Sequence, residues 1–566
     1  MASRRWIELS ADPKAVRRVV EHRGFTDLAA RVLVERGLTE PDDIDRFLSP
    51  KLADLPEPEA MAGLAGAVDL VVEALGAGSP VCVYGDYDVD GTTATSLLLD
   101  VFARLRHPAF YLIPERGGDG YGFHPALVRE AARRGAKLIV TVDTGITGHE
   151  ACAEARSLGV KTAILDHHEL PRELPAADAI VNPHQQGCGF TDENLTGVGL
   201  AFFLAGALRR RLVKGRRVKR DGFDVRELLD LVALGTIADM APVTGVNRAL
   251  IAAGLDRLTK GRRAGVNALR AVAGVKNRPV DYYTVAFSLA PRINAAGRVG
   301  KADDAVDLLT TADEDRAEQL AKALDRQNGA RQDIEQDILA RARKMAAENP
   351  HLDKLYTLVL AGEGWHPGVI GIVASRLVEE FHRPTVVIGF DGAAGKGSGR
   401  SIKGFDLHAG LEACAASLIQ FGGHRAAAGL TIERARLAEF MQAFERHARK
   451  VLRKSDLEPS VAVHPVDKLD EVDERAAAQI DAMAPFGIGN PAPVFATRGA
   501  RVVHKTVLKD EHLKLRLAAG REAVSALGWR MAGRYGEVGA TVDIAYQIGI
   551  NEFRGRREVQ LTIKDL

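Results

Sequence analysis

The stretch Val81-Cys-Val-Tyr-Gly-Asp86-Tyr-Asp88-Val-Asp90-Gly91 places three carboxylates, two residues apart, directly after a short apolar run. Such a run is typical of a strand buried in a parallel sheet. Three like charges at the end of a buried strand repel one another and lose hydration, so they need a cation. Ligands of open α/β sheets collect outside the carboxyl ends of the strands. The stretch therefore predicts a divalent-metal site; the alternative is an acidic surface turn, where Asp and Gly are common.

The composition is that of an ordinary soluble globular protein. The chain has 566 residues, 46% hydrophobic and 27% charged, and this length predicts three or four domains. No apolar run approaches the length of a membrane span, and the first residues lack the apolar core of a signal peptide. The four cysteines are scattered without CxxC pairing. This pattern argues against a zinc ribbon or a disulfide framework and predicts a cytoplasmic protein.

Strand and helix patterns alternate through the first half of the chain. Apolar runs typical of strands occur at 81–83, 109–113, 137–142 and 161–165, with helical periodicity between them. This alternation predicts βαβ units and a parallel sheet. Because ligands of such sheets collect at the carboxyl ends of the strands, the residues that follow each strand are the candidates for a site.

Acidic side chains follow three of these strands and one helix. After the strands come Asp86, Asp88 and Asp90, then Asp143, then Asp166 with His167 and His168; the helical segment 226–238 ends in Asp239. A single Asp after a strand is usually a helix cap or a turn residue. Four acidic ends, one of them with a His-His pair, favour metal chemistry over four unrelated caps.

These four motifs resemble those of the DHH phosphoesterase superfamily, and the wider pattern is similar to its RecJ family of single-strand-specific exonucleases. Three further stretches carry the likeness: Pro291-Arg-Ile-Asn-Ala-Ala-Gly-Arg298, the segment 364–376, and Ser398-Gly-Arg-Ser401 with Gly422-Gly-His-Arg-Ala-Ala-Ala-Gly429. The resemblance covers residues 60–566. None of these motifs is specific alone, but their order and spacing together are very specific.

The resemblance implies an α/β multidomain fold. We expect a parallel-sheet DHH phosphoesterase domain, a long connector helix, a smaller α/β DHH-associated substrate-binding domain and a C-terminal OB-like β-barrel, at 61–300, 301–350, 351–455 and 456–566 respectively. Residues 1–60 are predicted to form a helical N-terminal segment. The helical pattern of 313–349 indicates either a connector that forms one side of a cleft or an ordinary bundle helix. Five short alternating runs after residue 500 are typical of an OB barrel.

Phosphodiester hydrolysis needs an activated water and neutralised phosphate oxygens, which two metal ions supply together. Oxygen ligands with one imidazole suit Mn²⁺ or Mg²⁺. By resemblance, Asp86 and Asp88 would hold one ion, and Asp143 would bridge it to the second. The ligands expected for the second ion are Asp90, His167 and Asp239.

The resemblance also implies roles for the remaining two residues of the third motif. His168 would lie near the scissile phosphate, where it stabilises charge or protonates the leaving oxygen, because imidazole titrates near neutral pH. Asp166 would orient this segment without binding a metal ion itself; the alternative is a structural cap. The catalytic residues expected are therefore His168, Asp143 and Asp166.

Substrate-binding residues are expected in both halves of the chain. By resemblance, the 5′ end would be held by Arg116, Arg292 and Arg298 from the first half and by Ser398, Arg400 and Ser401 from the second; His424 would touch the substrate or pack. The Gly-rich stretch 392–401 is predicted to be a flexible phosphate-binding loop, with a hairpin turn as the alternative. Arg suits phosphate recognition through its bidentate fork.

Basic and aromatic residues of the C-terminal region predict either a groove for single-stranded nucleic acid or a polar barrel exterior. They are Lys505, Lys514, Arg516, Trp529, Phe553, Arg554, Arg556 and Arg557. The attachment of a barrel to a two-metal phosphoesterase favours the groove.

We expect a 5′→3′ exonuclease that hydrolyses single-stranded DNA with two divalent ions, Mn²⁺ or Mg²⁺, in DNA repair and recombination. The direction and the preference for DNA rest on the resemblance. We expect a monomer away from membranes, with single-strand-binding protein and a helicase as partners. One alternative is a small-nucleotide phosphodiesterase for short RNA or a cyclic dinucleotide, which needs no barrel. The other is a catalytically inactive scaffold that only binds DNA, against which the intact acidic and His motifs argue.

Overall fold

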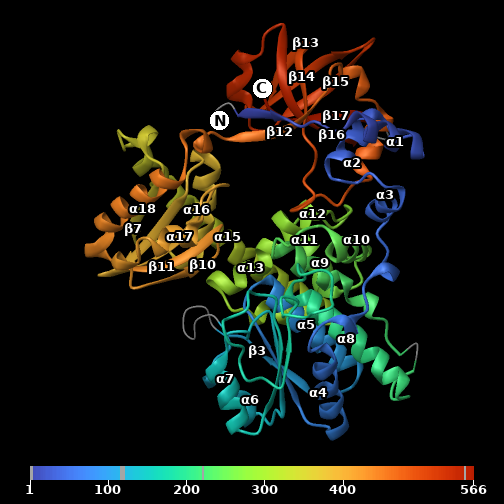
Figure 1. The fold of residues 1–566 in the computed structure, drawn as a ribbon, viewed down its shortest axis with the longest axis vertical. Helices are drawn as coiled ribbons and strands as arrows, with labels where there is room; N and C mark the ends of the chain where they lie inside the picture. Colours follow the sequence, from blue (N-terminus) through green and yellow to red (C-terminus); the bar gives the residue numbers. More distant parts are fainter. Residues whose placement is uncertain (1–3, 115–121, 220–221, 554–555) are drawn as a thin grey trace. The chain divides into compact units, whose positions relative to one another are not determined.

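The computed structural model describes residues 4–114, 122–219, 222–553 and 556–566 (Figure 1). The chain divides into two compact units. The first contains residues 1–49, 332–484 and 492–566, and the second contains residues 50–331 and 485–491. We describe each unit by itself.

A five-stranded parallel sheet forms the centre of the second unit, as predicted. Its strands are ordered β3-β2-β4-β5-β6, with bounds β2 Val81–Gly85, β3 Ala109–Leu112, β4 Leu138–Val142, β5 Lys161–Leu165 and β6 Ala179–Val181. In the register, Gly85 pairs with Val142, and Val142 pairs with Leu165. The strands β2, β4 and β5 therefore end level with one another, and the acidic segments that follow them begin at the same edge.

Helices cover both faces of this sheet. Helices α6 and α7 pack on one face, and α4, α5, α8 and α9 form the core on the other. The bounds are α4 Leu64–Ala77, α5 Val89–Arg104, α6 Pro125–Arg133, α7 His149–Ser157, α8 Gly197–Lys214, α9 Leu229–Ala238, α10 Gly245–Lys260, α11 Ala264–Val272, α12 Tyr282–Thr284, α13 Ala290–Val299 and α14 Asp303–Thr310. Short 3₁₀ turns lie at Leu52–Asp54, Pro58–Ala60 and Val225–Leu228, and a π-helical turn, η4, spans Val285–Leu289.

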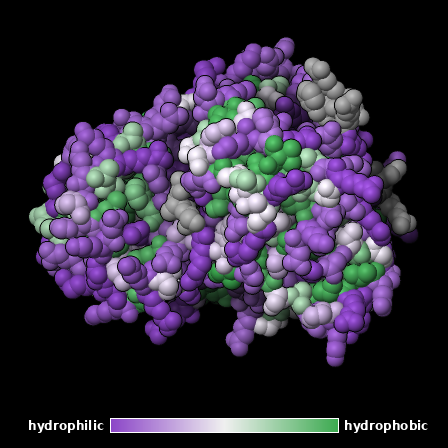
Figure 2. All heavy atoms as spheres, turned by 90° about the horizontal axis from the view of Figure 1, so that it is seen from above, coloured by the Kyte–Doolittle hydropathy of each residue, from purple (hydrophilic) through white to green (hydrophobic). Residues whose placement is uncertain are grey.

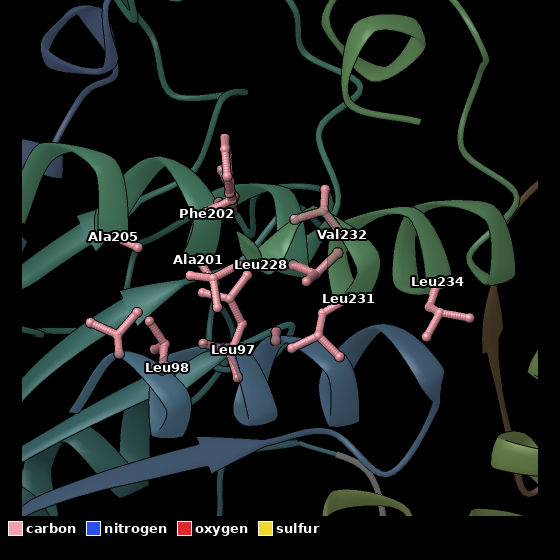
Figure 3. Close-up of a cluster of buried hydrophobic side chains, with 14 of the residues drawn as sticks. Leu97, Leu98, Ala201, Phe202, Ala205, Leu228, Leu231, Val232 and Leu234 are labelled. Carbon is pink, nitrogen blue, oxygen red and sulfur yellow. The ribbon is translucent and has the colours of Figure 1, made fainter. Parts of the chain in front are cut away.

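Three of these helices fix the geometry of the acidic edge. Figure 3 shows Leu97 and Leu98 of α5 packed with Ala201 of α8 and Leu231 of α9 in one apolar cluster. Asp90 lies in the first turn of α5, and Asp239 is the C-cap of α9. Because a dry, close-packed core holds the three helices together, the residues at their ends keep fixed positions relative to one another.

The long helix predicted between the two halves is confirmed as α15, Glu314–Ala347. Its first part packs Ala317, Leu320 and Leu324 into the core of the second unit. Its last part packs Ile338 and Ala342 against the core of the domain that follows, in the first unit. One continuous helix thus contributes to both hydrophobic cores. It does so through the apolar residues that recur at helical spacing along its length.

The second sheet, in the first unit, belongs to a smaller α/β domain, as predicted. Its strands are ordered β10-β11-β9-β8-β7, with bounds β7 Leu358–Glu363, β8 Thr385–Asp391, β9 Ala394–Arg400, β10 Gln420–Gly423 and β11 Ala427–Glu433. Its helices are α16 Pro367–Phe381, α17 Leu407–Glu412 and α18 Leu437–Val451, with 3₁₀ turns at Leu352–Lys354, Ala415–Ser417, Arg434–Arg436 and Lys454–Leu457. Only β7 and β8 are parallel neighbours.

The prediction of a flexible loop at 392–401 is wrong, and the hairpin alternative holds. Residues 394–400 form β9, which pairs with β8 on one side and β11 on the other. Its alternate glycines lie directly over core side chains: a Cβ atom on Gly397 would stand 2.8 Å from Leu430, and one on Gly399 would stand 2.9 Å from Leu407. The glycines therefore serve close packing and not flexibility, and the ladder occupies backbone groups that a phosphate loop would present.

The C-terminal region is a five-stranded closed barrel, as predicted. Strands β13-β14-β15-β17-β16 run in this order, and β13 pairs with β16 to close the ring. The bounds are β13 Phe495–Leu508, β14 His512–Ala519, β15 Glu522–Gly528, β16 Thr541–Phe553 and β17 Arg556–Asp565; β12 Ser460–Pro465 and α19 Glu474–Asp481 precede them, with 3₁₀ turns at Leu469–Glu471 and Ala532–Glu537. Closure leaves no long exposed edge in the ring.

The N-terminal segment is not helical throughout, which corrects the prediction for its first residues. Helices α1 Pro13–Arg23, α2 Asp27–Glu35 and α3 Pro41–Leu48 are present, but Arg5–Glu8 form β1, which runs parallel to β12. The Trp6 indole donates to a carboxylate oxygen of Asp565 at 2.9 Å. A four-residue strand whose partner lies more than 450 residues away has no local signal in the sequence.

One face of the molecule is drawn with its hydropathy in Figure 2. Figure 2 shows that the face seen from above is largely hydrophilic and carries separate, smaller hydrophobic patches. No single helix in the described ranges is long and apolar enough to cross a membrane; one bent pair, Leu52–Ala60 with Leu64–Ala77, passes that test by length and composition only.

Candidate metal centre

The three carboxylates of the opening stretch occupy the turn from β2 into α5. Asp86 directly follows β2, and Asp88 is the N-cap of α5, where its carboxylate accepts a hydrogen bond from the Gly91 N–H at 3.0 Å. Asp90 lies one residue into the helix and is 1% exposed. The strand end and the helix cap therefore fix the backbone that carries all three acids.

Asp143 follows β4 with a left-handed backbone, φ +60°. Asp tolerates this conformation better than most residues, and its N–H still continues the sheet by donating to the Leu165 carbonyl at 2.9 Å. Helix α8 begins beside it: a Cβ atom on Gly197 would stand 2.5 Å from the Cβ of Asp143. Only glycine fits at that position, so the N-terminus of α8 comes directly against the acidic edge.

The N-terminus of α8 holds the buried Asp90. The backbone N–H groups of Gly197 and Val198 donate to the two carboxylate oxygens of Asp90 at 2.6 and 3.0 Å. These N–H groups have no partner inside their own helix, and the helix dipole favours a negative charge there. Sequence reasoning missed this contact; the signal that could have found it is Thr196-Gly-Val-Gly199, a helix start with small residues.

Two groups of three side chains have ligand atoms within 4.8 Å of one another and match the predicted sets: Asp86, Asp88 and Asp143, and Asp90, His167 and Asp239. In the second set, His167 Nε2 lies 3.9 Å from Asp90 and 3.8 Å from Asp239. An octahedral ion with ligands at about 2.1 Å separates neighbouring ligand atoms by about 3 Å and opposite ones by about 4 Å. The spacing therefore suits a divalent ion.

The two sets meet at Asp143. His167 Nε2 lies 3.0 Å from Asp143 Oδ1. A third group with the same spacing contains Asp143, His167 and His168. Asp143 thus belongs to one predicted set and lies within hydrogen-bond distance of the other.

The carboxylates of this edge destabilise one another. Burial, followed by the charges of Asp90, Asp88, Asp86 and Asp239, raises the pKa of Asp143 well above its usual range. Burial and the Asp88 charge raise the pKa of Asp90 to about 7 despite its bonds to α8. Asp239, with 30% of its side chain exposed, has its pKa raised by burial and by Asp90 and Asp88. Bound cations would remove this repulsion, so the residues fit divalent metal.

The two histidines have opposite protonation tendencies. Burial and the neighbouring His168 lower the pKa of His167 to about 4, so its ring is neutral near pH 7, as a metal ligand must be. Burial alone would lower the pKa of His168 as well. The hydrogen bond to Asp166, with the charges of Asp166, Asp239 and Asp88, instead raises that pKa to about 9.

Asp166 holds His168 in place. Its Oδ1 lies 2.7 Å from His168 Nδ1 and accepts the His168 backbone N–H at 3.1 Å, while its Oδ2 accepts the Ile146 N–H at 2.9 Å. The bond to Nδ1 leaves Nε2 as the ring nitrogen that faces other partners. Asp166 therefore combines the two roles considered for it, since it orients the imidazole and ties down the backbone.

The substrate residues predicted in the second unit are partly described. Arg116 lies outside the described residues. On α13, Arg292 is paired with Asp325 of α15 at 2.8 Å and donates to the Ser288 carbonyl at 2.6 Å, and Arg298 is half-buried. A Cβ atom on Gly297 would stand 2.4 Å from the Tyr87 carbonyl oxygen. Helix α13 therefore lies directly against the acidic segment, another contact that the sequence did not predict.

The substrate residues predicted in the first unit gather at one end of the second sheet. Arg400 ends β9, and its guanidinium donates to Ser398 Oγ at 3.2 Å. The Ser401 N–H donates to the Ala426 carbonyl at 3.0 Å, beside the exposed His424 in the β10–β11 turn. Helix α16 packs over this strand with Gly371 where a side chain would meet Ser398.

The barrel residues predicted for a strand-binding groove differ in their exposure and in their partners. Lys505 is half-buried and donates to the carbonyls of Tyr535 and Val538 at 3.2 and 2.6 Å, so its ammonium group is engaged within the fold, and its assignment to the groove stays a prediction. Arg516 is exposed opposite Ser525, and Trp529 is 57% exposed beside His512. Arg557 lies 3.9 Å from Glu474. Arg554 and the side chains of Phe553 and Arg556 lie outside the described residues.

Comparison with known proteins places three family domains along the chain. The profile of the DHH family, N-terminal domain, matches residues 80–236, the DHHA1 domain matches 353–450, and the RecJ OB domain matches 467–565. The three follow in the order that the motifs predicted.

Relatives match over almost the whole chain. The single-stranded-DNA-specific exonuclease RecJ of Bacillus subtilis (strain 168) is 36% identical over 99% of this chain and 70% of its own length. The protein of the same name from Escherichia coli (strain K12) is 35% identical over 95% of each chain. The crystal structure of RecJ from Thermus thermophilus in complex with Mn²⁺ has a TM-score of 0.84, 32% identity, and covers 99% of this chain and 79% of that one. The chain belongs to the RecJ family of the DHH phosphoesterase superfamily.

Proposed function

We propose that this protein is a metal-dependent 5′→3′ exonuclease that hydrolyses single-stranded DNA. The observation that carries the proposal is the pair of three-residue ligand sets that share the edge around Asp143. The relatives named above are single-stranded-DNA-specific exonucleases by name, and they match 95% or more of this chain. The 5′→3′ direction and the role in DNA repair and recombination are part of the proposal.

We assign Asp86 and Asp88 to one divalent ion, Asp90, His167 and Asp239 to a second, and Asp143 to both. Oxygen-rich ligands with a single imidazole favour Mn²⁺ or Mg²⁺, and the Thermus relative was crystallised with Mn²⁺. When bound, such a pair of ions activates water and neutralises the phosphate oxygens. The chain's own part is to hold the carboxylates at fixed spacing and to keep the His167 ring neutral.

His168 supplies the proton chemistry in this proposal. With Nδ1 bound to Asp166 at 2.7 Å, a protonated ring presents its Nε2–H to the phosphate. That hydrogen bond either stabilises charge that develops on the phosphate oxygens or delivers a proton to the leaving oxygen. Asp166 acts through His168, because it fixes the tautomer and the ring orientation.

Recognition of the 5′ end would use arginines from both units. In the first unit, Arg400, Ser398, Ser401 and His424 gather at one sheet end, and their hydroxyl and guanidinium groups suit a phosphate. In the second unit, Arg116, Arg292 and Arg298 are the proposed partners. Because Arg292 is paired with Asp325, we expect its guanidinium to exchange that partner for the DNA backbone.

The barrel would hold the strand beyond the site, with exposed Arg516 and Trp529 as contacts to backbone and bases. We expect a monomer that meets its substrate with the help of single-strand-binding protein and a helicase. The four cysteines are free thiols, which suits the reducing cytoplasm.

The test uses strands that differ in one feature each. Single-stranded and duplex DNA with an exonuclease-resistant block at the 5′ or the 3′ end are incubated with Mn²⁺, Mg²⁺ or chelator, and the products are resolved by length. We expect digestion of the single strand with a blocked 3′ end, resistance of the strand with a blocked 5′ end, and no digestion in chelator. Digestion of dinucleotides alone would favour a small-nucleotide phosphodiesterase, and no hydrolysis under any condition would favour a binding scaffold.

A further inference from the structure

Two aromatic rings stack on the surface of the second unit. Phe287 is 69% exposed, more than any other large apolar side chain in the described ranges, and Tyr283 is 50% exposed. Their ring centroids lie 5.9 Å apart with planes 14° apart, an offset stack. The pair leaves much of the Phe287 ring in contact with water, which costs free energy unless a partner covers it.

The exposure of the pair does not come from a loosely held helix. Asp281 caps the start of α12 by accepting hydrogen bonds from the Thr284 N–H and hydroxyl at 2.7 and 2.6 Å. The other side of the same helix is buried at Val285 and Leu289. The pair is therefore presented by a fixed element, and its turn, η4, is π-helical, a feature that is frequent at functional sites.

This helix leads directly to the metal centre. The turns α12, η4 and α13 follow one another without a break from Tyr282 to Val299. Near the end of α13, a Cβ atom on Gly297 would stand 2.4 Å from the carbonyl oxygen of Tyr87, the residue between the proposed ligands Asp86 and Asp88. Ten helical residues separate Phe287 from Gly297, which corresponds to about 15 Å. A stacked single strand covers that distance in about four nucleotides at roughly 3.4 Å each.

We propose that Tyr283 and Phe287 form a platform on which a nucleobase of the single strand stacks, about four nucleotides from the phosphate being cut. The proposal rests on the proposed function and deepens it. Every base has a π face, so the platform accepts any base, which suits an exonuclease that digests strands of any sequence. The platform lies on the same continuous helical segment as Arg292 and Arg298. Contacts to the DNA backbone, from the arginines, and to a base, from the platform, would therefore come from one rigid element. A double helix, with its bases paired inside, has no free base to offer.

The test moves a single abasic site along a single-stranded oligonucleotide, from the second to the tenth position from the 5′ end. For wild type, we expect a rise of KM for first-bond cleavage, about tenfold, only when the abasic site reaches the platform near the fourth or fifth position. Phe287→Ala should raise KM on the intact strand by a similar factor, with kcat within about twofold of wild type. It should also lose its sensitivity to the abasic site at that position.

Two further variants isolate the role of the ring. Phe287→Trp should restore both KM and the sensitivity to the abasic site, because it restores a π face. The matched control is Leu158→Ala, which removes another exposed apolar side chain (41% exposed) at the end of α7. It should behave as wild type. An unchanged KM in Phe287→Ala, or undiminished sensitivity to the abasic site, would overturn the platform and leave the pair as a contact for a protein partner.

Binding separates this proposal from the proposed function. The same strands are bound to wild type and to Phe287→Ala in chelator, and affinity is followed by fluorescence anisotropy. If wild type binds but never hydrolyses, the proposed exonuclease function fails, while a loss of affinity in Phe287→Ala would still support the platform. If wild type hydrolyses and Phe287→Ala binds with unchanged affinity, the platform fails and the exonuclease function stands.

Discussion

Gly197, the first residue of helix α8, lies against Asp143 so closely that a Cβ atom on Gly197 would stand 2.5 Å from the Cβ of Asp143. This approach lets the first N–H groups of α8 reach Asp90, while Asp143 keeps its left-handed backbone. The acidic edge is therefore built by a helix start as well as by strand ends. The glycine is as much a part of the centre as the carboxylates are.

Gly197→Ala should consequently disrupt the centre without removing any ligand. The added methyl group must push α8 away from Asp143 or shift Asp143 itself, and a misplacement of about 1 Å can cost on the order of 100-fold in rate. The measurement is the initial rate of single-strand hydrolysis at saturating Mn²⁺. The control is Gly206→Ala in the same helix, where nothing lies within 4 Å of the added Cβ. That variant should keep full activity, and a Gly197→Ala enzyme as active as Gly206→Ala would contradict the role given to the close approach.

Asp166→Asn tests the positioning of His168. The amide keeps the size of the side chain but loses the charge that raises the pKa of His168. We expect a drop in kcat of about 10- to 100-fold, typical for the loss of a group that orients a catalytic or ligating His. KM for the strand should change little. If the protonated imidazole is the active form, activity falls as pH rises through its pKa, so the alkaline limb of the pH–rate profile should move to lower pH in the variant. An unchanged profile would speak against His168 as the proton donor.

Asp565 ties the N-terminal strand to the barrel, and its charge should make stability depend on pH. Its carboxylate accepts hydrogen bonds from Trp6, Arg534 and the Arg4 N–H, which together hold its pKa below the usual value even though burial acts to raise it. A carboxyl group with a lowered folded-state pKa stabilises the protein above its unfolded pKa of about 3.9 and loses this contribution as pH falls through the folded-state value.

Asp565→Asn should therefore lower the free energy of unfolding at pH 7 by about 1–3 kcal/mol. It should also flatten the dependence of stability on pH between roughly pH 5 and the acid limit of folding. Urea unfolding at several pH values measures both effects. Asp510→Asn is the control, because Asp510 is exposed and its left-handed backbone, φ +55°, is one that Asn adopts easily. Equal losses of stability in the two variants would show that the hydrogen bonds of Asp565 make no particular contribution to stability.

The barrel should contribute to affinity for long strands and not to the chemical step. Arg516→Ala removes an exposed cation, so the slope of log affinity against log salt should fall by about 0.7 for a single strand. Trp529→Ala should weaken binding roughly tenfold through the loss of a stacking surface. Arg226→Ala, whose guanidinium pairs with Asp224 on the other unit's surface, is the control. If Arg516→Ala left the slope of log affinity against log salt unchanged, this face of the barrel would be a polar surface that does not bind the strand.

The sequence predicted those parts of the fold and site that have a local signal. Apolar runs of three to six residues predicted the strands. Because parallel strands end at one edge, the Asp and His residues after them could be grouped without coordinates. The spaced apolar residues of 313–349 likewise predicted α15.

The missed features depend on residues far apart in the chain. β1 needs β12 as its partner, and the contacts Gly197–Asp143 and Gly297–Tyr87 join segments separated by tens to hundreds of residues. The prediction of a flexible loop for the Gly-rich stretch 392–401 was wrong for a related reason. Glycine is common in loops, but in β9 alternate glycines make room for Leu430 and Leu407, which the local sequence does not reveal.

Asp143→Asn changes the residue that we assign to both ions, so this variant probes the shared metal centre itself. Isothermal titration of Mn²⁺ is followed by hydrolysis of a single strand with a blocked 3′ end by the same samples. A shared two-metal centre predicts about two Mn²⁺ per wild-type chain. For Asp143→Asn it predicts loss of tight Mn²⁺ binding and hydrolysis at least 1,000-fold slower, which corresponds to roughly 4 kcal/mol of transition-state stabilisation. Mn²⁺-dependent hydrolysis by Asp143→Asn at the wild-type rate would contradict the shared two-metal centre.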